Sequence, residues 1–278
     1  EAATADLGDY NQVDPFHLEA YKETAINYNR DVEIFPVVKH ILRRIMGDDR
    51  VYKSPTDMGV NRAGFAITAD DVVRRAATQE VVRRYFRYQC EYKMGLTGQE
   101  TVDRVKLLMT ELGCSETDRA VVLPARQAAE QARANGRGHD GMFCGAAIEL
   151  ADGRLVTGKN SALLHAASAS VLNAIKALAG IPDNIHLLSG LVLQSVGAMK
   201  TEILGGGQVS LNLEETLIAL SVSAAANPMA QAALQQLKAL HGCEMHLTHI
   251  PTPGDESGLR RLGVNLTCDP NFSSKFLQ

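Results

Sequence analysis

The chain of 278 residues contains no tryptophan and few aromatic residues, and it has no apolar run of the ~18 residues that a membrane-spanning helix needs. It also lacks a basic surplus, because 28 Lys and Arg residues stand against 32 Asp and Glu, for a net charge of −4. A nucleic-acid or anionic-membrane binder needs a basic patch. The sequence therefore argues against both kinds of partner, and nothing at its start resembles a signal peptide.

Paired cysteines are absent as well. The chain has five cysteines, an odd number, and they are widely spaced with no CxxC pair. They are Cys90, Cys114, Cys144, Cys243 and Cys268. This pattern argues against a disulfide framework and against a cysteine-based zinc site, and it is typical of a reducing cytoplasm.

The first 135 residues have mainly helical patterning. Helices are predicted over 14–30, 34–46, about 68–95, 99–112 and 124–134, from apolar periodicity and capping residues. The segment NGRGHDG, residues 135–141, then breaks the composition. We predict a helical domain over 1–138 and an α/β domain over 139–278.

The second half has strand patterning. GAAIEL (145–150) and RLVTG (154–158) are joined by an Asp-Gly turn, which is a strong hairpin signal. Asn160 or Ser161 is expected to cap a helix that ends near residue 178. Further strands are predicted at 184–188, 243–250 and 264–268, with helices at 212–226, 228–240 and 256–263. The fold class is α/β (α+β), with helices packed on the faces of a mixed sheet.

The segment from 145 to 178 resembles the opening of the cytidine deaminase fold, in which a hairpin leads into a helix. Those enzymes carry a zinc ligand and an acid/base glutamate at the helix start, and a later PCxxC segment supplies further ligands. Here His165 matches the ligand position, but Ala167 replaces the glutamate and no PCxxC occurs. The resemblance therefore predicts a deaminase-like fold without deaminase chemistry, and zinc is not expected.

Cys243, His246 and His249 have a spacing that suggests metal ligands. On a strand, however, side chains alternate between faces. Cys243 and His249 would point to one face and His246 to the other, so the sequence argues against a metal site there.

Two sets of polar residues are candidates for a binding site. The loop from Thr157 to Ser161 sits at a predicted helix N-terminus, where N–H groups and Lys159 could hold a phosphate or carboxylate. Ordinary turn and capping chemistry explains the same residues. The loop candidates are Thr157, Gly158, Lys159 and Ser161.

The second set lies in NYNRD and SPTDMGVNRAG, where hydrogen-bonding residues gather at helix ends and loops. These residues are Asn27, Asn29, Arg30, Asp31, Asp57 and Asn61. The alternative is that they only tie helix ends and loops together.

Several long motifs carry a wider resemblance. They are EAATADL, DPFHLEAYKETAINYNRDVEIFPV, SPTDMGVNRAGF, DGRLVTGKNSALL and LRRLGVNLTCDP. They resemble the C-terminal part of a bacterial family called domain of unknown function 1846. Its members begin with an α/β domain that carries a GPGSGK-type phosphate loop, so the resemblance implies that this chain starts after that domain.

Two functions follow from these patterns. The first is an enzyme that handles a nucleotide, accompanied by Mg²⁺, or another phosphorylated small molecule. In it Arg30 and Lys159 hold the anion, and Asp57 and Asp31 are the catalytic carboxylates. The alternative is a non-catalytic binding or oligomerisation module on a metal-free deaminase-like fold, in which residues 213–240 pack between subunits of a homo-oligomer.

Overall fold

The computed structural model describes residues 41, 44, 45, 47, 70–206 and 209–273. The predicted helix at 14–30 and most of that at 34–46 lie outside these residues, although 41, 44 and 45 are helical. The chain forms two compact units, Glu1–Arg119 and Ala120–Gln278.

The described part of the first unit is helical, as predicted. Helix α4 (Asp70–Lys93) packs against α5 (Gln99–Leu112), and a 3-10 turn follows at Glu116–Asp118. Phe86 of α4 and Val105 of α5 are fully buried. Helix α5 ends at Gly113, whose left-handed φ of 64° lets its N–H bond back to the last turn.

The second unit begins with α6 (Val122–Ala134). We predicted the boundary at residue 138, after this helix, whereas the compact units divide at residue 119. The reason is tertiary, because α6 packs on the sheet of the second unit through β1. The composition break at 135–141 is therefore a loop inside that unit.

Four strands form the sheet, which confirms the α/β class. They are β1 (Gly145–Glu149), β2 (Leu155–Lys159), β3 (Glu244–Leu247) and β4 (Asn265–Cys268), in the order β2-β1-β3-β4. Strand β1 is antiparallel to β2 and β3, and β3 is parallel to β4. The Asp-Gly hairpin is present as predicted, with Gly153 at a φ of 81°.

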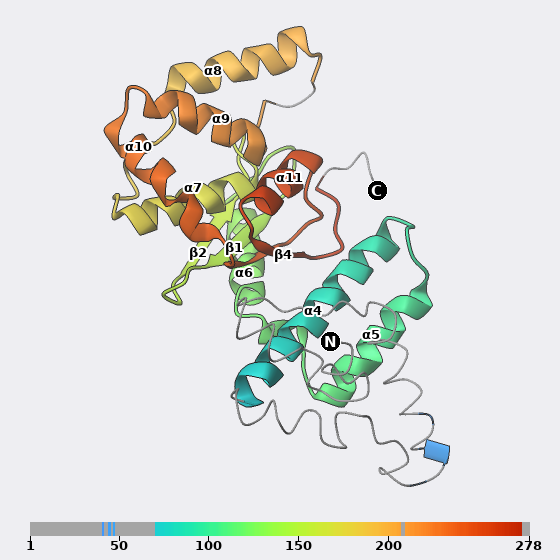
Figure 1. Cartoon of the computed structure of the whole chain (residues 1–278). Coiled ribbons are helices and arrows are strands. Elements are labelled where there is room, and N and C mark those ends of the chain that lie inside the picture. Colours follow the sequence, from blue (N-terminus) through green and yellow to red (C-terminus); the bar gives the residue numbers. More distant parts are fainter. Residues whose placement is uncertain (1–40, 42–43, 46, 48–69, 207–208, 274–278) are drawn as a thin grey trace. The chain divides into compact units, whose positions relative to one another are not determined.

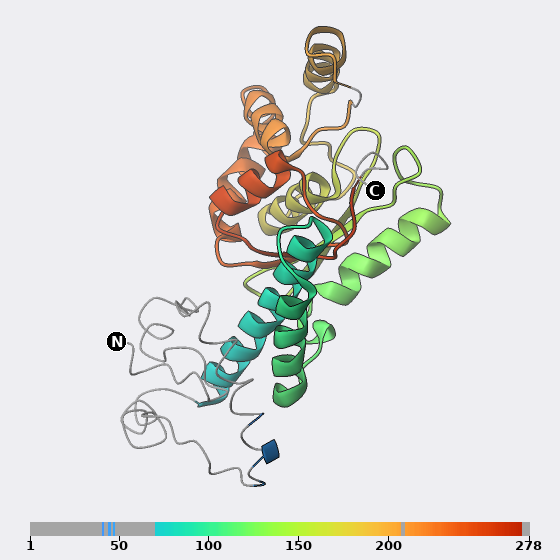
Figure 2. The same ribbon diagram turned by 90° about the vertical axis from the view of Figure 1, so that its right-hand side faces the viewer.

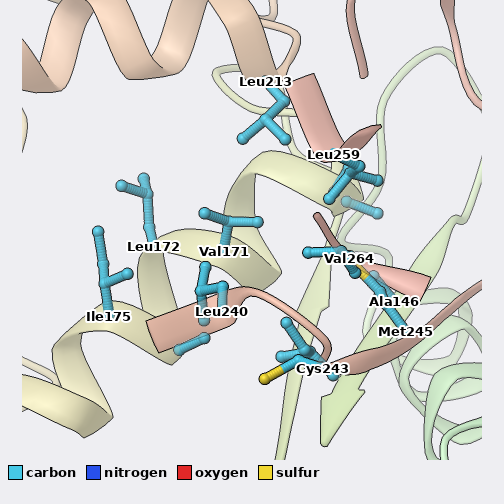
Figure 3. Packing of buried hydrophobic residues seen from close by; sticks show 14 of the residues in the cluster. Ala146, Val171, Leu172, Ile175, Leu213, Leu240, Cys243, Met245, Leu259 and Val264 are labelled. Carbon is cyan, nitrogen blue, oxygen red and sulfur yellow. The ribbon is translucent and has the colours of Figure 1, made fainter. Parts of the chain in front are cut away.

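Helices cover both faces of β1 because its side chains alternate. Ala147 packs with Val121 and Ala125, next to α6. Ala146 and Ile148 belong to the main core on the opposite face, shown in part in Figure 3. That core is built on α7 (Ala166–Ala179), which packs against β1 and β2.

The remaining helices are α8 (Gly190–Ala198), a π-helix (Met199–Ile203), α9 (Leu213–Ala224), α10 (Pro228–Gln235), a 3-10 helix (Gln236–Leu240) and α11 (Pro253–Arg261). Helices α9, α10 and α11 and the second 3-10 helix contribute to this main core, whereas α8 lies beside α9 (Figure 1). Asn212 caps α9, the helix predicted over 212–226, and forms a capping box with Glu215. The Asn212 side chain accepts from the Glu215 N–H, and the Glu215 carboxylate accepts from the Asn212 N–H. Leu213, Leu240 and Leu259 bring three of these elements into the core (Figure 3).

One predicted strand is wrong. Residues 184–188 are irregular and follow a turn in which the Ile185 N–H donates to the Pro182 carbonyl. The segment still contributes to packing, because Leu187 is buried in the main core. Helix α8 was not predicted from the sequence.

Within the described ranges, no helix is long and apolar enough to cross a membrane.

Candidate acid–base site

The ends of three strands and the start of the fourth lie at one edge of the sheet. The register pairs Gly145 with Lys159, and Leu247 with both Ala146 and Cys268. The start of β1 and the ends of β2, β3 and β4 therefore meet at the same edge. In open α/β sheets, ligands bind in the crevice outside the carboxyl ends of the strands.

Side chains after the strands tie this edge together. The side-chain oxygen Oδ1 of Asn160 accepts from the Cys144 N–H at 2.8 Å, and its side-chain Nδ2 donates to the Met142 carbonyl at 3.0 Å. Thr248 Oγ1 accepts from Gly145 N–H at 2.8 Å. These bonds satisfy backbone groups that leave the sheet ladder here.

A histidine–aspartate pair lies at this edge. His165 precedes α7, and its Nδ1 lies 2.7 Å from Oδ2 of Asp255 in α11. The side chain of Asp255 is fully buried, whereas that of His165 is 20% exposed. The pair thus joins a buried carboxylate to an imidazole that solvent reaches.

Asp255 is held by several donors. The Thr252 hydroxyl donates to Oδ2 at 2.7 Å, and the Leu213 N–H, at the start of α9, donates to Oδ1 at 2.8 Å. Burial alone would raise the pKa of Asp255, but the bond and charge of His165 and the two further donors outweigh it. The pKa therefore lies below its usual value, and Asp255 is ionised at neutral pH.

A second network lies at the end of β4. Arg126 of α6 donates twice to Asp269, at 2.6 and 3.1 Å, and His246 Nε2 lies 3.3 Å from Asp269 Oδ1. His246 also contacts Thr267 Oγ1 through Nδ1, at 2.9 Å. Burial would raise the pKa of Asp269, but the bonds from His246 and Arg126 lower it to about 2.

His249 lies in the electrostatic field of both networks. It is 4% exposed, and its buried Nδ1 has no hydrogen-bond partner among the described residues. Burial lowers its pKa to about 4, against the charge of Asp255 and with the help of His165 and His246. His249 is therefore neutral at pH 7, with a polar atom unsatisfied inside the protein.

The thiol of Cys144, in the electrostatic field of Asp255, is not in its nucleophilic form. Cys144 is buried, and burial together with the charge of Asp255 raises its pKa to about 11. The thiolate is the nucleophilic form of cysteine. Cys144 therefore remains a neutral thiol at pH 7.

The predicted phosphate-binding loop is placed differently from the expectation. Helix α7 begins at Ala166, with His165 as its N-cap, so neither Asn160 nor Ser161 caps it. Ser161 Oγ instead accepts from the N–H groups of Leu163 and Leu164, both at 3.2 Å. Helix α7 starts later than predicted because the Asn160 side chain bonds the backbone of Met142 and Cys144 before β1, while Ser161 bonds the loop that leads to α7.

Three of the predicted loop residues do come together, in strand β2. Thr157, Gly158 and Lys159 line an open pocket of about 220 Å³ between α6 and α7. Gln131 and Asn173 add polar groups to it. The other predicted site residues lie outside the described residues, namely Asn27, Asn29, Arg30, Asp31, Asp57 and Asn61.

Sequence reasoning missed Asp255, Asp269 and Arg126. Two signals were available: Asp255 stands in a Thr-Pro-Gly-Asp helix start, and Asp269 in the quoted motif LRRLGVNLTCDP. The argument from strand alternation does not apply to His249, because β3 ends at Leu247 and His249 follows the strand. In the part of the chain that the structure describes, no three His, Cys, Asp or Glu residues are grouped to hold a metal ion.

Comparison with known proteins identifies the family of the chain. Residues 1–113 match the model described as domain of unknown function DUF1846, N-terminal, and residues 117–277 match its C-terminal counterpart. A UPF0371 protein of Clostridium botulinum (strain Alaska E43 / Type E3) is 49% identical over 278 residues, which is 100% of this chain and 55% of that protein. A UPF0371 protein of Clostridium tetani (strain Massachusetts / E88) is 46% identical over 277 residues, with the same coverage of 100% and 55%.

The chain thus spans about half the length of the curated relatives it matches. The expectation that it contains the C-terminal part alone is wrong, because the N-terminal model matches residues 1–113. Matches to both models, together covering nearly every residue, show that this chain belongs to the DUF1846 family.

Proposed function

We propose that the second unit carries the acid–base site of an enzyme that acts on a nucleotide or another phosphorylated small molecule. In this proposal His165 transfers the proton and Asp255 orients and stabilises the imidazole. The observation that carries it is the 2.7 Å contact between His165 Nδ1 and the fully buried Asp255 carboxylate.

The chemistry follows from the two ring nitrogens. With its Nδ1–H donated to Asp255, a neutral His165 has an unprotonated Nε2, which is the form of a general base. Among the described residues nothing bonds Nε2, and the side chain is accessible to solvent. When Nε2 takes a proton from a substrate hydroxyl or a water, the imidazolium is stabilised by the carboxylate beside it.

Burial of Asp255 supports a catalytic role over a simple link between helices. Burying an ionised carboxylate costs several kcal/mol unless donors compensate for it. The chain compensates with a histidine, a hydroxyl and a helix N-terminal N–H. Such an arrangement fixes the tautomer and orientation of His165, which general-base catalysis requires.

Two observations support an anionic substrate. Helix α7 begins directly after His165 and has no side-chain cap, so its N-terminal dipole and N–H groups favour negative charge near the site. Lys159 lines the pocket on β2 together with Thr157 and Gly158, and its ammonium group can pair with a phosphate. Binding of Mg²⁺ with a nucleotide through the segments 27–31 and 54–64 remains a prediction.

We further infer a relation to the cytidine deaminase fold, supported by the hairpin that leads into α7 with His165 at the helix start. Ala167, which is fully buried, stands where those enzymes carry the acid/base glutamate. The proposed chemistry is therefore proton transfer by His165 and Asp255 rather than zinc-dependent deamination.

The test uses the full chain with ATP, GTP and smaller phosphorylated compounds, with and without Mg²⁺. Isothermal titration measures binding, and mass spectrometry measures consumption of each ligand that binds. We expect His165→Ala and Asp255→Asn to lower the turnover rate by about 10²–10⁴-fold, while binding changes little. His186→Ala is the matched control, because His186 is an exposed histidine of the same unit.

Two results would count against the proposal. Absence of heat with every nucleotide and phosphorylated compound would refute the substrate class. Turnover that survives His165→Ala would refute the site. The alternative, a non-catalytic module, predicts that a ligand binds without being consumed.

A further inference from the structure

The first turn of α7 carries three backbone N–H groups for which the described residues provide no acceptor. They belong to Ala166, Ala167 and Ser168, which are fully buried. The Ala169 N–H is the first of this helix to be bonded, and it donates to the His165 carbonyl. Buried N–H groups are rarely left unpaired in proteins. These three donors are therefore available to a ligand.

The neighbouring helix starts differ, because side chains cap them. In α9 the Leu213 N–H donates to Asp255, and the Glu215 N–H donates to the Asn212 side chain. In α11 the Asp255 N–H donates to the Thr252 hydroxyl at 3.4 Å. Helices α9 and α11 lie side by side, and α7 also contacts α9 (Figures 1 and 2). The chain thus caps the two helix starts next to the acid–base site and leaves that of α7 without a side-chain cap.

His249 adds a second unpaired polar group at this place. It is 4% exposed, and its Nδ1 accepts from or donates to none of the described residues. The Thr248 N–H donates to the Gly145 carbonyl at 3.0 Å, which holds His249 at the sheet edge beside the acid–base site. The charged groups that act most strongly on His249 are Asp255 and His165, the pair at the start of α7. A neutral imidazole carries one N–H, so His249 can donate to the same ligand.

We propose that the first turn of α7 and His249 together bind a phosphate or carboxylate oxygen of the substrate. The donors are the N–H groups of Ala166, Ala167 and Ser168 and the imidazole of His249. This inference rests on the proposed function and names the groups that hold the anionic part of the substrate beside His165.

The physical reason is the charge of a helix start. The free N–H groups and the dipole of an α-helix both favour negative charge at its N-terminus. His165 directly precedes these donors, and its side chain is 20% exposed, so this end of α7 is open to solvent at the imidazole. Negative charge that develops on the substrate when His165 removes a proton is stabilised by the same donors.

Titration of the full chain with inorganic phosphate, and separately with acetate, tests the proposal. Isothermal titration measures the affinity, and ¹H–¹⁵N NMR of a deuterated sample locates the anion. We expect the amide resonances of Ala166, Ala167 and Ser168 to shift with at least one of the two anions. A response to phosphate alone would identify a phosphoryl group as the ligand, and a response to acetate alone would identify a carboxylate.

Ala166→Pro removes one donor in a backbone that accepts proline. Ala166 is the first residue of α7, where proline is tolerated, and His165 before it already has an extended backbone with φ −67° and ψ 159°. A hydrogen bond to a charged group contributes about 10- to 100-fold in affinity, so the variant should weaken anion binding by that factor. Gly190→Pro is the matched control, because Gly190 is the first residue of α8, follows an extended Ser189, and a Cβ there meets nothing within 4 Å. It should leave anion binding unchanged.

His249→Phe is the second variant, since it keeps a ring of similar size and removes both ring nitrogens. It should weaken anion binding by about 10-fold or more. Far-UV circular dichroism verifies that each variant is folded.

Two outcomes would overturn the inference. The first is a wild-type chain in which neither anion shifts the three amide resonances, which would leave ordered water as their partner. The second is anion binding that Lys159→Ala abolishes and Ala166→Pro leaves intact, which would assign the anion to the pocket on β2. The proposed function fails in a different way, because anion binding at α7 without consumption of any phosphorylated compound would retain this site and refute the enzyme.

Discussion

Replacing Asp269 with asparagine should destabilise the second unit in a pH-dependent way. The side chain of Asp269 is 8% exposed and pairs with Arg126 and His246, so it links β4 to α6 and β3. Its pKa is lowered from 3.8 to about 2. At about 1.4 kcal/mol for each pH unit, that difference corresponds to about 2 kcal/mol of stability at neutral pH.

The sign of the pH dependence is fixed by the direction of this pKa change. A carboxylate whose folded pKa lies below its unfolded pKa stabilises the protein above about pH 4, where it is ionised in both states. That stabilisation disappears as the pH falls through the folded value of about 2. The difference in unfolding free energy between wild type and Asp269→Asn should therefore be largest near pH 6 and close to zero near pH 2.

Urea denaturation followed by circular dichroism, at pH values from 6 down to 2, measures this difference. Hydrogen exchange of peptides from β3 and β4 assigns the change to the second unit. Asp152→Asn is the matched control, because Asp152 pairs with Arg154 on an exposed hairpin, and its loss should have little effect. A destabilisation by Asp269→Asn that is the same at pH 6 and pH 2 would contradict the reasoning, as would an equal effect of the control.

Three further predictions follow from the same geometry. His249 has a pKa of about 4 in the folded chain, so acidification from pH 6.5 to 4 should lower the unfolding free energy by about 3 kcal/mol. His249→Gln should weaken this dependence of the unfolding free energy on pH in the same urea titration. An unchanged pH dependence would contradict the burial of His249 as a neutral imidazole. Gly158→Ala should lower the melting temperature strongly, because its Cβ would lie 2.2 Å from the Ser170 nitrogen, whereas Gly190→Ala meets nothing within 4 Å and should be neutral. Asn212→Ala removes the α9 cap and should cost about 1 kcal/mol in urea denaturation, and a neutral result would show that the capping bonds do not contribute.

Local patterns predicted most elements of the second unit well. The Asp-Gly turn predicted the hairpin, Asn212 and Asn227 precede the helices predicted from 212 and 228, and the predicted strands 243–250 and 264–268 contain β3 and β4. These signals depend on residues near one another in sequence, such as a capping side chain and the N–H groups of the next turn. They do not specify which elements pack together.

The wrong predictions concern residues whose structure depends on contacts with residues distant in sequence. Residues 184–188 have the apolar content of a strand, but Leu187 is buried in the main core without pairing in the sheet. Asn160 is a good helix cap by type, yet its side chain bonds Cys144 and Met142, which lie 16 and 18 residues away. No local pattern distinguishes these outcomes.

The candidate site also depends on contacts between residues distant in sequence. From sequence, His165 was identified at a helix start and His246 and His249 by their spacing, but their chemical roles were not. Asp255 lies 90 residues from His165, and Asp269 lies 143 residues from Arg126. Only packing of α6, α7 and α11 around one sheet edge brings these groups within hydrogen-bonding distance.

The sequence by itself determined the family, the α/β class and the local start and end of most elements, because these depend on composition, periodicity and capping over a few residues. Tertiary structure decided the unit boundary and the histidine–aspartate networks. Burial and long-range hydrogen bonds set the charge of a buried histidine or carboxylate, and they exist only once the distant segments are packed together.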